Sequence, residues 1–192
     1  THTAWEDVAL IREIPGAVIC DPADDVQMEW IIKEFLKMEG IHYVRSNRKA
    51  VRNVYKKGSS FKIGQGNILK EGKDILIIAA GQLVSEALDC AEELEKEGYS
   101  VEVIDMFTIK PLDEKLLIKE AKGKSKIVTI ENHSIYGGLG SAVSEVIAEN
   151  GISVPVKRIG VKEKFGQVGT AEFLQEEFGL TAKQIKETIC QF

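Results

Sequence analysis

Apolar runs and amphipathic stretches alternate along the chain from about residue 72 onward. Residues 75–80 form an unbroken apolar run, which is typical of a strand buried on both faces of a parallel sheet. Further runs of strand character occupy residues 101–105, 126–130 and 154–159. Stretches with apolar residues at helical spacing lie between them. Residues 67–69 add an edge strand, so the pattern predicts an α/β fold with a doubly wound, mostly parallel five-stranded sheet.

The first part of the chain predicts a smaller, incomplete unit. Residues 1–52 contain two predicted helices and two predicted strands, at 17–20 and 41–45. Because four short elements alone can bury little surface, we interpret them as the second half of a larger α/β domain. Because the first helix follows at once on a start without methionine, we expect the chain to begin inside that domain. The polar, glycine-rich residues 53–66 predict a linker, and residues 67–192 a C-terminal domain.

Two short helices are predicted at the end of the chain. Each begins after a threonine that can cap it, Thr170 in one case and Thr181 in the other. We expect both helices to cover one face of the sheet.

Composition and charge narrow the functional classes. The chain has 192 residues, of which 44% are hydrophobic and 29% charged, and its net charge of -5 argues against a surface that binds nucleic acid or anionic lipid. No apolar run reaches the roughly 18 residues that a membrane span needs, so we expect a cytoplasmic protein. The three cysteines follow no metal or disulfide spacing and are expected to be ordinary buried thiols. The histidines also lack ligand spacing, so a metal site made by this chain alone is not expected.

Several ordered motifs together resemble one family. The first of them lie in the N-terminal part and are Thr1-His2 followed by Glu6-Asp7, Ile14-Pro15-Gly16, Asp21-Pro22-Ala23-Asp24 and Val44-Arg45-Ser46-Asn47-Arg48. They resemble the second half of the pyrimidine-binding domain of transketolase. The later motifs lie at residues 67–74, 103–113, 131–143 and 165–169, and they are similar to the transketolase C-terminal domain. The whole pattern is most similar to the C-terminal section of split transketolases, in which two polypeptides divide the enzyme.

The resemblance implies thiamine diphosphate chemistry that transfers a two-carbon ketol unit between sugar phosphates. In the family, a separate N-terminal section holds the diphosphate and its Mg²⁺, so this chain is expected to hold neither cofactor and to be inactive alone. The implied partners are that N-terminal section, sugar phosphate substrates and further copies of the chain, most simply in a dimer. No nucleic-acid or membrane partner is expected.

Three residues are candidates for the substrate site. His2 matches a family histidine, and imidazole can hydrogen-bond the donor substrate and exchange a proton near neutral pH. Arg48 matches the arginine that grips the substrate phosphate, for which a guanidinium fork is well suited, and Arg45 lies on the same segment as a second candidate. Without the resemblance, these residues would read as a histidine at a frayed terminus and a solvated basic turn. Asp7 and Asp24 are better explained by helix-end and turn roles.

Other interpretations remain open. The glycine loop at residues 137–140 opens a helix and can bind an anion through free N–H groups, although tight packing of helix on sheet is the stronger interpretation. Related enzymes with this domain order are 1-deoxyxylulose-5-phosphate synthase and the β part of 2-oxoacid dehydrogenases. A different class is a noncatalytic module that serves dimerisation or regulation.

Overall fold

A five-stranded sheet forms the centre of the computed structural model, which describes residues 4–192. Its strand order is β3-β5-β4-β7-β8, and all neighbouring strands are parallel except the edge strand β3, which is antiparallel to β5. The strands are β3 (Asn67–Lys70), β4 (Ile75–Ala79), β5 (Val101–Asp105), β7 (Lys126–Ser134) and β8 (Val156–Val161). The predicted fold class is confirmed.

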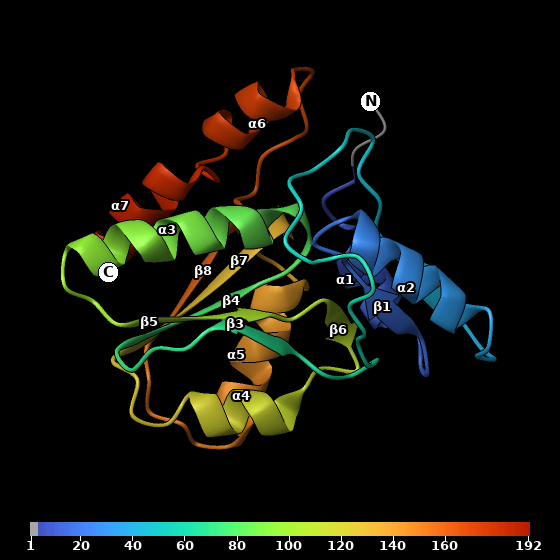
Figure 1. Cartoon of the computed structure of the whole chain (residues 1–192), viewed down its shortest axis with the longest axis horizontal. Coiled ribbons are helices and arrows are strands. Elements are labelled where there is room, and N and C mark those ends of the chain that lie inside the picture. The colour runs from blue at the N-terminus through green and yellow to red at the C-terminus, as the bar shows by residue number, and fades with distance from the viewer. Residues whose placement is uncertain (1–3) are drawn as a thin grey trace.

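Helices cover both faces of this sheet (Figure 1). The helices are the short 3-10 turn η1 (Gly81–Leu83), α3 (Val84–Lys96), α4 (Glu114–Glu120), α5 (Leu139–Glu149), α6 (Ala171–Glu177) and α7 (Ala182–Gln191). One apolar core joins the sheet to α3 and α7, and a second core joins the opposite face to α4 and α5. The central strand β4 is buried at every position, as its unbroken apolar run predicts.

Threonine caps begin the two terminal helices, as predicted. The Thr170 hydroxyl accepts a hydrogen bond from the N–H of Phe173, and Thr181 forms a capping box with Gln184. Such caps satisfy N–H groups that have no partner within the helix. Of the two helices, α7 packs on α3, and its Ile185 and Ile189 are buried.

The N-terminal part forms a second, three-stranded sheet. Its elements are α1 (Asp7–Arg12), β1 (Val18–Cys20), α2 (Asp25–Phe35) and β2 (His42–Val44). Strand β1 pairs in parallel with β2 and antiparallel with β6 (Thr108–Lys110), which belongs to the C-terminal part. The sequence pattern did not predict β6, because its pairing partner Cys20 lies 88 residues from Thr108 along the chain.

The segment predicted as a linker packs against both parts. Tyr55 contacts the core under α3, and Phe61 packs edge-on against Trp30 and Phe107 at centroid distances of 5.6 and 5.8 Å. The limits 1–52, 53–66 and 67–192 stay a prediction, but in space the three stretches form one continuous body (Figure 1).

Two further expectations concern the cysteines and the membrane. Cys20 and Cys90 are buried as expected, but Cys190 is exposed near the C-terminal end of α7, so the prediction of a buried thiol was wrong there. Its position one residue after the buried Ile189 turns it to the outer face of the amphipathic helix.

None of the helices in the described part of the chain has the length and apolar character of a membrane span.

Candidate functional site at the junction of the two sheets

Two charged residues follow the carboxyl ends of neighbouring parallel strands. Asp21 comes directly after β1, and Arg45 comes directly after β2. Carboxyl ends of parallel strands share one edge of a sheet, which is where doubly wound folds place ligands. The two side chains meet there, with 3.0 Å between Arg45 Nη1 and Asp21 Oδ2.

Arg45 is almost fully enclosed by its partners. Its side chain is only 13% exposed. Nε donates to Asp7 Oδ2 at 2.9 Å, Nη1 donates to Asp21 Oδ2 and to the carbonyl of Asn132 at 3.0 Å each, and Nη2 donates to the carbonyl of Ala4 at 3.1 Å. A guanidinium has five N–H donors, so four of them are engaged.

The electrostatics of this cluster favour its charged forms. Burial disfavours the Arg45 cation, but Asp21 and Asp7 outweigh that cost and raise the pKa of Arg45. Burial likewise opposes ionisation of Asp7, yet Arg45 and the Tyr43 hydroxyl lower the Asp7 pKa below its usual value. Arg45, Asp7 and Asp21 therefore form one network of two ion pairs.

Arg48 lies three residues further along and in a different environment. It is exposed, and among residues 4–192 no hydrogen bond or ion pair engages its side chain. The two arginine candidates thus share one segment, but one is buried in ion pairs and the other faces solvent. His2 lies outside the described residues.

His133 and Glu131, on β7, extend the cluster into the C-terminal sheet. His133 Nδ1 lies 2.7 Å from the carbonyl of Ser134, so this nitrogen carries the proton and Nε2 points towards Asp7 Oδ1 at 3.8 Å. Neither Nε2 nor Oδ1 has a hydrogen-bond partner among the described residues. Burial lowers the pKa of His133, which makes the ring neutral at pH 7.

The glycine loop is filled from within. The Glu131 carboxylate accepts hydrogen bonds from the N–H groups of Leu139 and Gly140 at 2.7 and 2.8 Å, at the start of α5. A Cβ added at Gly138 would lie 2.0 Å from Glu131 Oε2, and one added at Gly137 would lie 2.5 Å from the Cβ of Ala9 in α1. The packing interpretation of this loop is confirmed, since its helix N-terminus already holds a carboxylate.

Asp105 at the end of β5 links the same edge to the N-terminal part. Its side chain is fully buried, and Oδ2 accepts hydrogen bonds from the Tyr55 hydroxyl at 2.6 Å and from Gln27 Nε2 at 2.7 Å. Burial raises the pKa of Asp105 to about 7. Asp24, also buried, accepts from Gln27 N as the cap of α2, so its predicted helix-end role is confirmed.

Sequence reasoning missed the partners of Arg45. Asp7 was expected at a helix end and does lie in the first turn of α1. It also accepts hydrogen bonds from Tyr43 in β2 and from Arg45, which follows β2. The signal that could have found Asp21 is its place directly after a strand, beside a basic residue after the neighbouring strand.

The fold and this junction define a doubly wound α/β domain with charged side chains at the carboxyl ends of its strands. A family model described as the transketolase C-terminal domain matches residues 64–185, and the chain belongs to that family.

Individual relatives match almost the whole chain. A 6-deoxy-6-sulfo-D-fructose transketolase subunit of a Clostridium species is 40% identical over 96% of this chain and 57% of its own length. A protein of Methanocaldococcus jannaschii named as a transketolase C-terminal section is 40% identical over 100% of this chain and 60% of its own. A 1-deoxy-D-xylulose-5-phosphate synthase of Heliobacterium modesticaldum is 35% identical over 96% of this chain and 29% of its own.

Solved structures give the same result. A split-gene transketolase, described as an inactive β4 tetramer, superposes with a TM-score of 0.92 at 40% identity and covers 99% of this chain and 61% of its own. A transketolase from Pichia stipitis covers 99% of this chain and 27% of its own at a TM-score of 0.77, and its 22% identity supports the fold alone. The chain therefore spans between 57% and 61% of the relatives that correspond to split sections.

Proposed function

We propose that this chain is the C-terminal section of a thiamine-diphosphate-dependent transketolase that transfers a two-carbon ketol unit between sugar phosphates. The observation that carries the proposal is the match to split-gene transketolase sections over nearly the whole chain. The chain supplies part of the substrate wall, and the complete assembly performs the reaction.

Arg48 is the proposed ligand of the substrate's terminal anion. Its exposed guanidinium has no internal partner among the described residues and follows the end of β2. A free guanidinium can form two parallel hydrogen bonds to phosphate oxygens. Two relatives are named for a sulfonated sugar and for apulose 4-phosphate, and both sugars carry an anionic group.

The cofactor is proposed to bind elsewhere in the assembly. Among residues 4–192, no group of three or more His, Cys, Asp or Glu side chains is arranged to hold a metal ion. The N–H groups of Leu139 and Gly140 at the start of α5 are taken by Glu131, so they do not fit a diphosphate. When bound, thiamine diphosphate supplies the electron sink of ketol transfer. We assign His2 to hydrogen bonding and proton exchange with the substrate in that assembly.

Reconstitution tests the proposal. The chain is expressed as part of a complete C-terminal section, of the length its split relatives have, together with a cofactor-binding section. Thiamine diphosphate and Mg²⁺ are then added, and ketol transfer between pentose phosphates is measured. Transfer that requires both sections supports the proposal. Absence of transfer from an assembly that is folded and associated by sedimentation would refute it. The same sedimentation run tests the proposed association of several copies.

The second candidate is 1-deoxyxylulose-5-phosphate synthase, because several relatives bear that name at 33 to 35% identity. That reaction would release CO₂ from pyruvate, whereas ketol transfer between pentose phosphates releases none. Supplying pyruvate and glyceraldehyde 3-phosphate to the same assembly and measuring CO₂ distinguishes the two reactions.

The Arg48 assignment has its own test. Replacing Arg48 with Ala is expected to raise the KM for a phosphorylated ketose about tenfold or more, since a charge-assisted contact is lost. Affinity for the cofactor should not change. The matched control is Lys62→Ala, which removes a cation from another surface. An unchanged KM in the Arg48→Ala enzyme would remove the phosphate role.

A further inference from the structure

Arg45 lies beside two segments of the described chain, called arms here, that are next in sequence to the proposed substrate residues His2 and Arg48. One arm is the chain that enters at Ala4, two residues after His2, and the Ala4 carbonyl accepts a hydrogen bond from Arg45 Nη2 at 3.1 Å. The other arm is the segment that follows β2 and carries Arg48 three residues beyond Arg45. Arg45 therefore contacts the first arm through its guanidinium and itself belongs to the second arm.

We propose that Arg45 is a positioning residue, which holds both arms against the C-terminal sheet and leaves binding of the phosphate to Arg48. This inference rests on the proposed function and replaces the expectation that Arg45 itself binds substrate.

The contacts of Arg45 span the whole junction. Asp7 belongs to α1, Asp21 follows β1, and the Asn132 carbonyl belongs to β7 of the five-stranded sheet. Together with the hydrogen bond from Nη2 to the Ala4 carbonyl, these hydrogen bonds leave from three different nitrogen atoms of a rigid planar fork. A lysine ammonium at this position keeps the charge but donates from a single nitrogen, so it cannot reproduce the geometry.

Strand periodicity reinforces the tether. Alternate residues of a strand point to the same face, so Tyr43 and Arg45 share one. Both bind the same oxygen of Asp7, the Tyr43 hydroxyl at 2.7 Å and Arg45 Nε at 2.9 Å. The end of β2 is thereby fixed at two points, and this sets the direction in which the Arg48 segment begins.

The local charge argues against phosphate at Arg45. Two ionised carboxylates, Asp7 and Asp21, surround one guanidinium, so the cluster is net negative, and the buried His133 adds no positive charge because its pKa is lowered. A third carboxyl, Glu131, has its pKa raised to about 7 by burial and adds no positive charge in either protonation state. A phosphate dianion that approached Arg45 would displace Asp7 or Asp21 and meet their repulsion.

Hydrogen exchange of the 192-residue chain tests the tether without catalysis. Arg45→Lys is expected to speed amide exchange about tenfold or more in peptides covering residues 4–12 and 42–50, since both arms lose their anchor, and to leave residues 75–79 unchanged. The matched control is Arg52→Lys, because Arg52 binds Asp89 and the Ser85 carbonyl on the outer surface. Equal exchange in wild type and Arg45→Lys would overturn the tether.

Kinetics of the reconstituted assembly separate positioning from ligation. With Arg45→Lys we expect kcat to fall about tenfold or more for a phosphorylated ketose and for hydroxypyruvate, a ketol donor without phosphate, because a misplaced arm affects both. The KM for the phosphorylated donor should change less than about twofold in Arg45→Lys. Arg48→Ala, in contrast, raises that KM and leaves the KM for hydroxypyruvate unchanged.

A selective rise of the KM for the phosphorylated donor in Arg45→Lys, or a lowered Tm with unchanged kcat, would overturn the positioning role. A wild-type assembly without ketol transfer would refute the proposed function, and the exchange experiment would still decide the tether.

Discussion

Asp105 offers a sharp test of the physical reasoning, because a carboxyl with no exposed surface sits at the contact between both parts of the molecule. Tyr55 and Gln27 donate to one of its oxygens, and the other oxygen has no partner among residues 4–192. Replacing Asp105 with Asn keeps the shape and one acceptor oxygen but removes the ionisable group.

The magnitude follows from the pKa. Burial raises the pKa of Asp105 from 3.8 to about 7 in the folded protein. The folded state then binds a proton that the unfolded state has released, so this group stabilises the fold fully below the unfolded pKa and loses that contribution as pH rises through about 7. Between the unfolded pKa of 3.8 and the folded pKa of about 7, each unit of pH changes the free energy of unfolding by about 1.4 kcal/mol. Between about pH 5 and pH 8 the wild type should therefore lose about 3 kcal/mol that the Asn variant keeps.

The assay is urea unfolding of both proteins, followed by circular dichroism at several pH values across that range. The advantage of Asp105→Asn over the wild type is expected to grow up to about pH 7 and to level off above it, whatever its sign at low pH. Glu187→Gln, which alters an exposed carboxylate on α7, serves as the control and should run parallel to the wild type. Parallel curves for Asp105→Asn would show that burial does not raise this pKa and would refute the reasoning.

The remaining predictions concern packing and capping. Gly138→Ala is expected to cost about 2–4 kcal/mol of stability, because its Cβ would lie 2.0 Å from a Glu131 oxygen and would drive the carboxylate from the start of α5. Gly166→Ala is the control, since its Cβ meets only ordinary contacts at 3.5 Å, and urea unfolding that shows equal losses would contradict the packing account. Thr181→Ala should lower the free energy of unfolding by about 1 kcal/mol through loss of the α7 cap, against almost no change for Glu187→Ala, and a Thr181 variant as stable as wild type would show the cap to be dispensable.

The sequence predicted those parts of the fold that depend on local pattern. The run at 75–80 could be read as a central strand because burial on both faces demands apolar residues at every position. Thr170 and Thr181 could be read as caps because the hydroxyl bonds to a residue only three positions away. Strand β6 could not be predicted, since three residues carry no period and the partner strand lies far along the chain.

The candidate site was predictable only in part. Arg45 and Arg48 belong to one basic stretch, and nothing local distinguishes the arginine that is buried from the one that is exposed. The distinction arises from Asp7, 38 residues away, and from the Asn132 carbonyl, 87 residues away. The role of Glu131 at the start of α5 could be predicted only weakly, because an acidic residue shortly before a glycine loop suits the positive end of the helix that follows.

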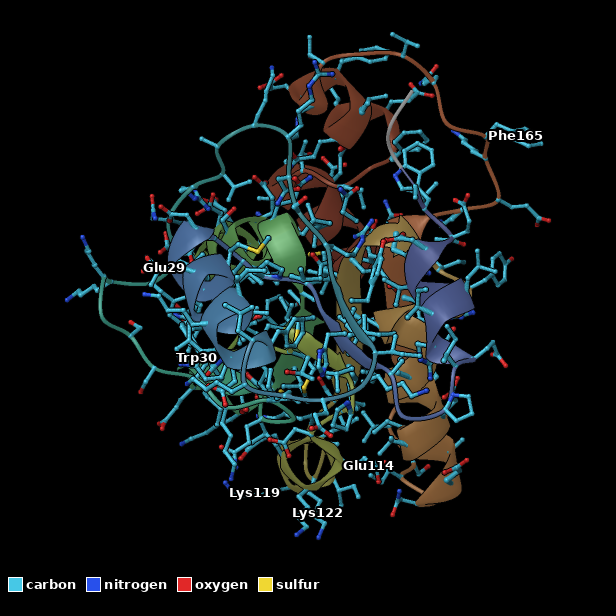
Figure 2. The ribbon with its side chains drawn as sticks, turned by 90° about the vertical axis from the view of Figure 1, so that its right-hand side faces the viewer. Glu29, Trp30, Glu114, Lys119, Lys122 and Phe165 are labelled. Atoms are coloured by element: carbon cyan, nitrogen blue, oxygen red, sulfur yellow. The ribbon has the colours of Figure 1, made fainter. Side chains whose placement is uncertain are left out.

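Strand β6 has a consequence for exchanging parts between related enzymes. It is encoded within the C-terminal part, yet it completes the sheet of the N-terminal part by pairing with β1 (Figure 1). Side-chain packing adds to this dependence, since Trp30 of α2, labelled in Figure 2, packs edge-on against Phe107 of the C-terminal part. A chimaera joined within residues 53–66 would bring together a β1 and a β6 from different parents. Its success would depend on how well those two short strands, and the residues between them, match one another, even though the join lies in neither strand.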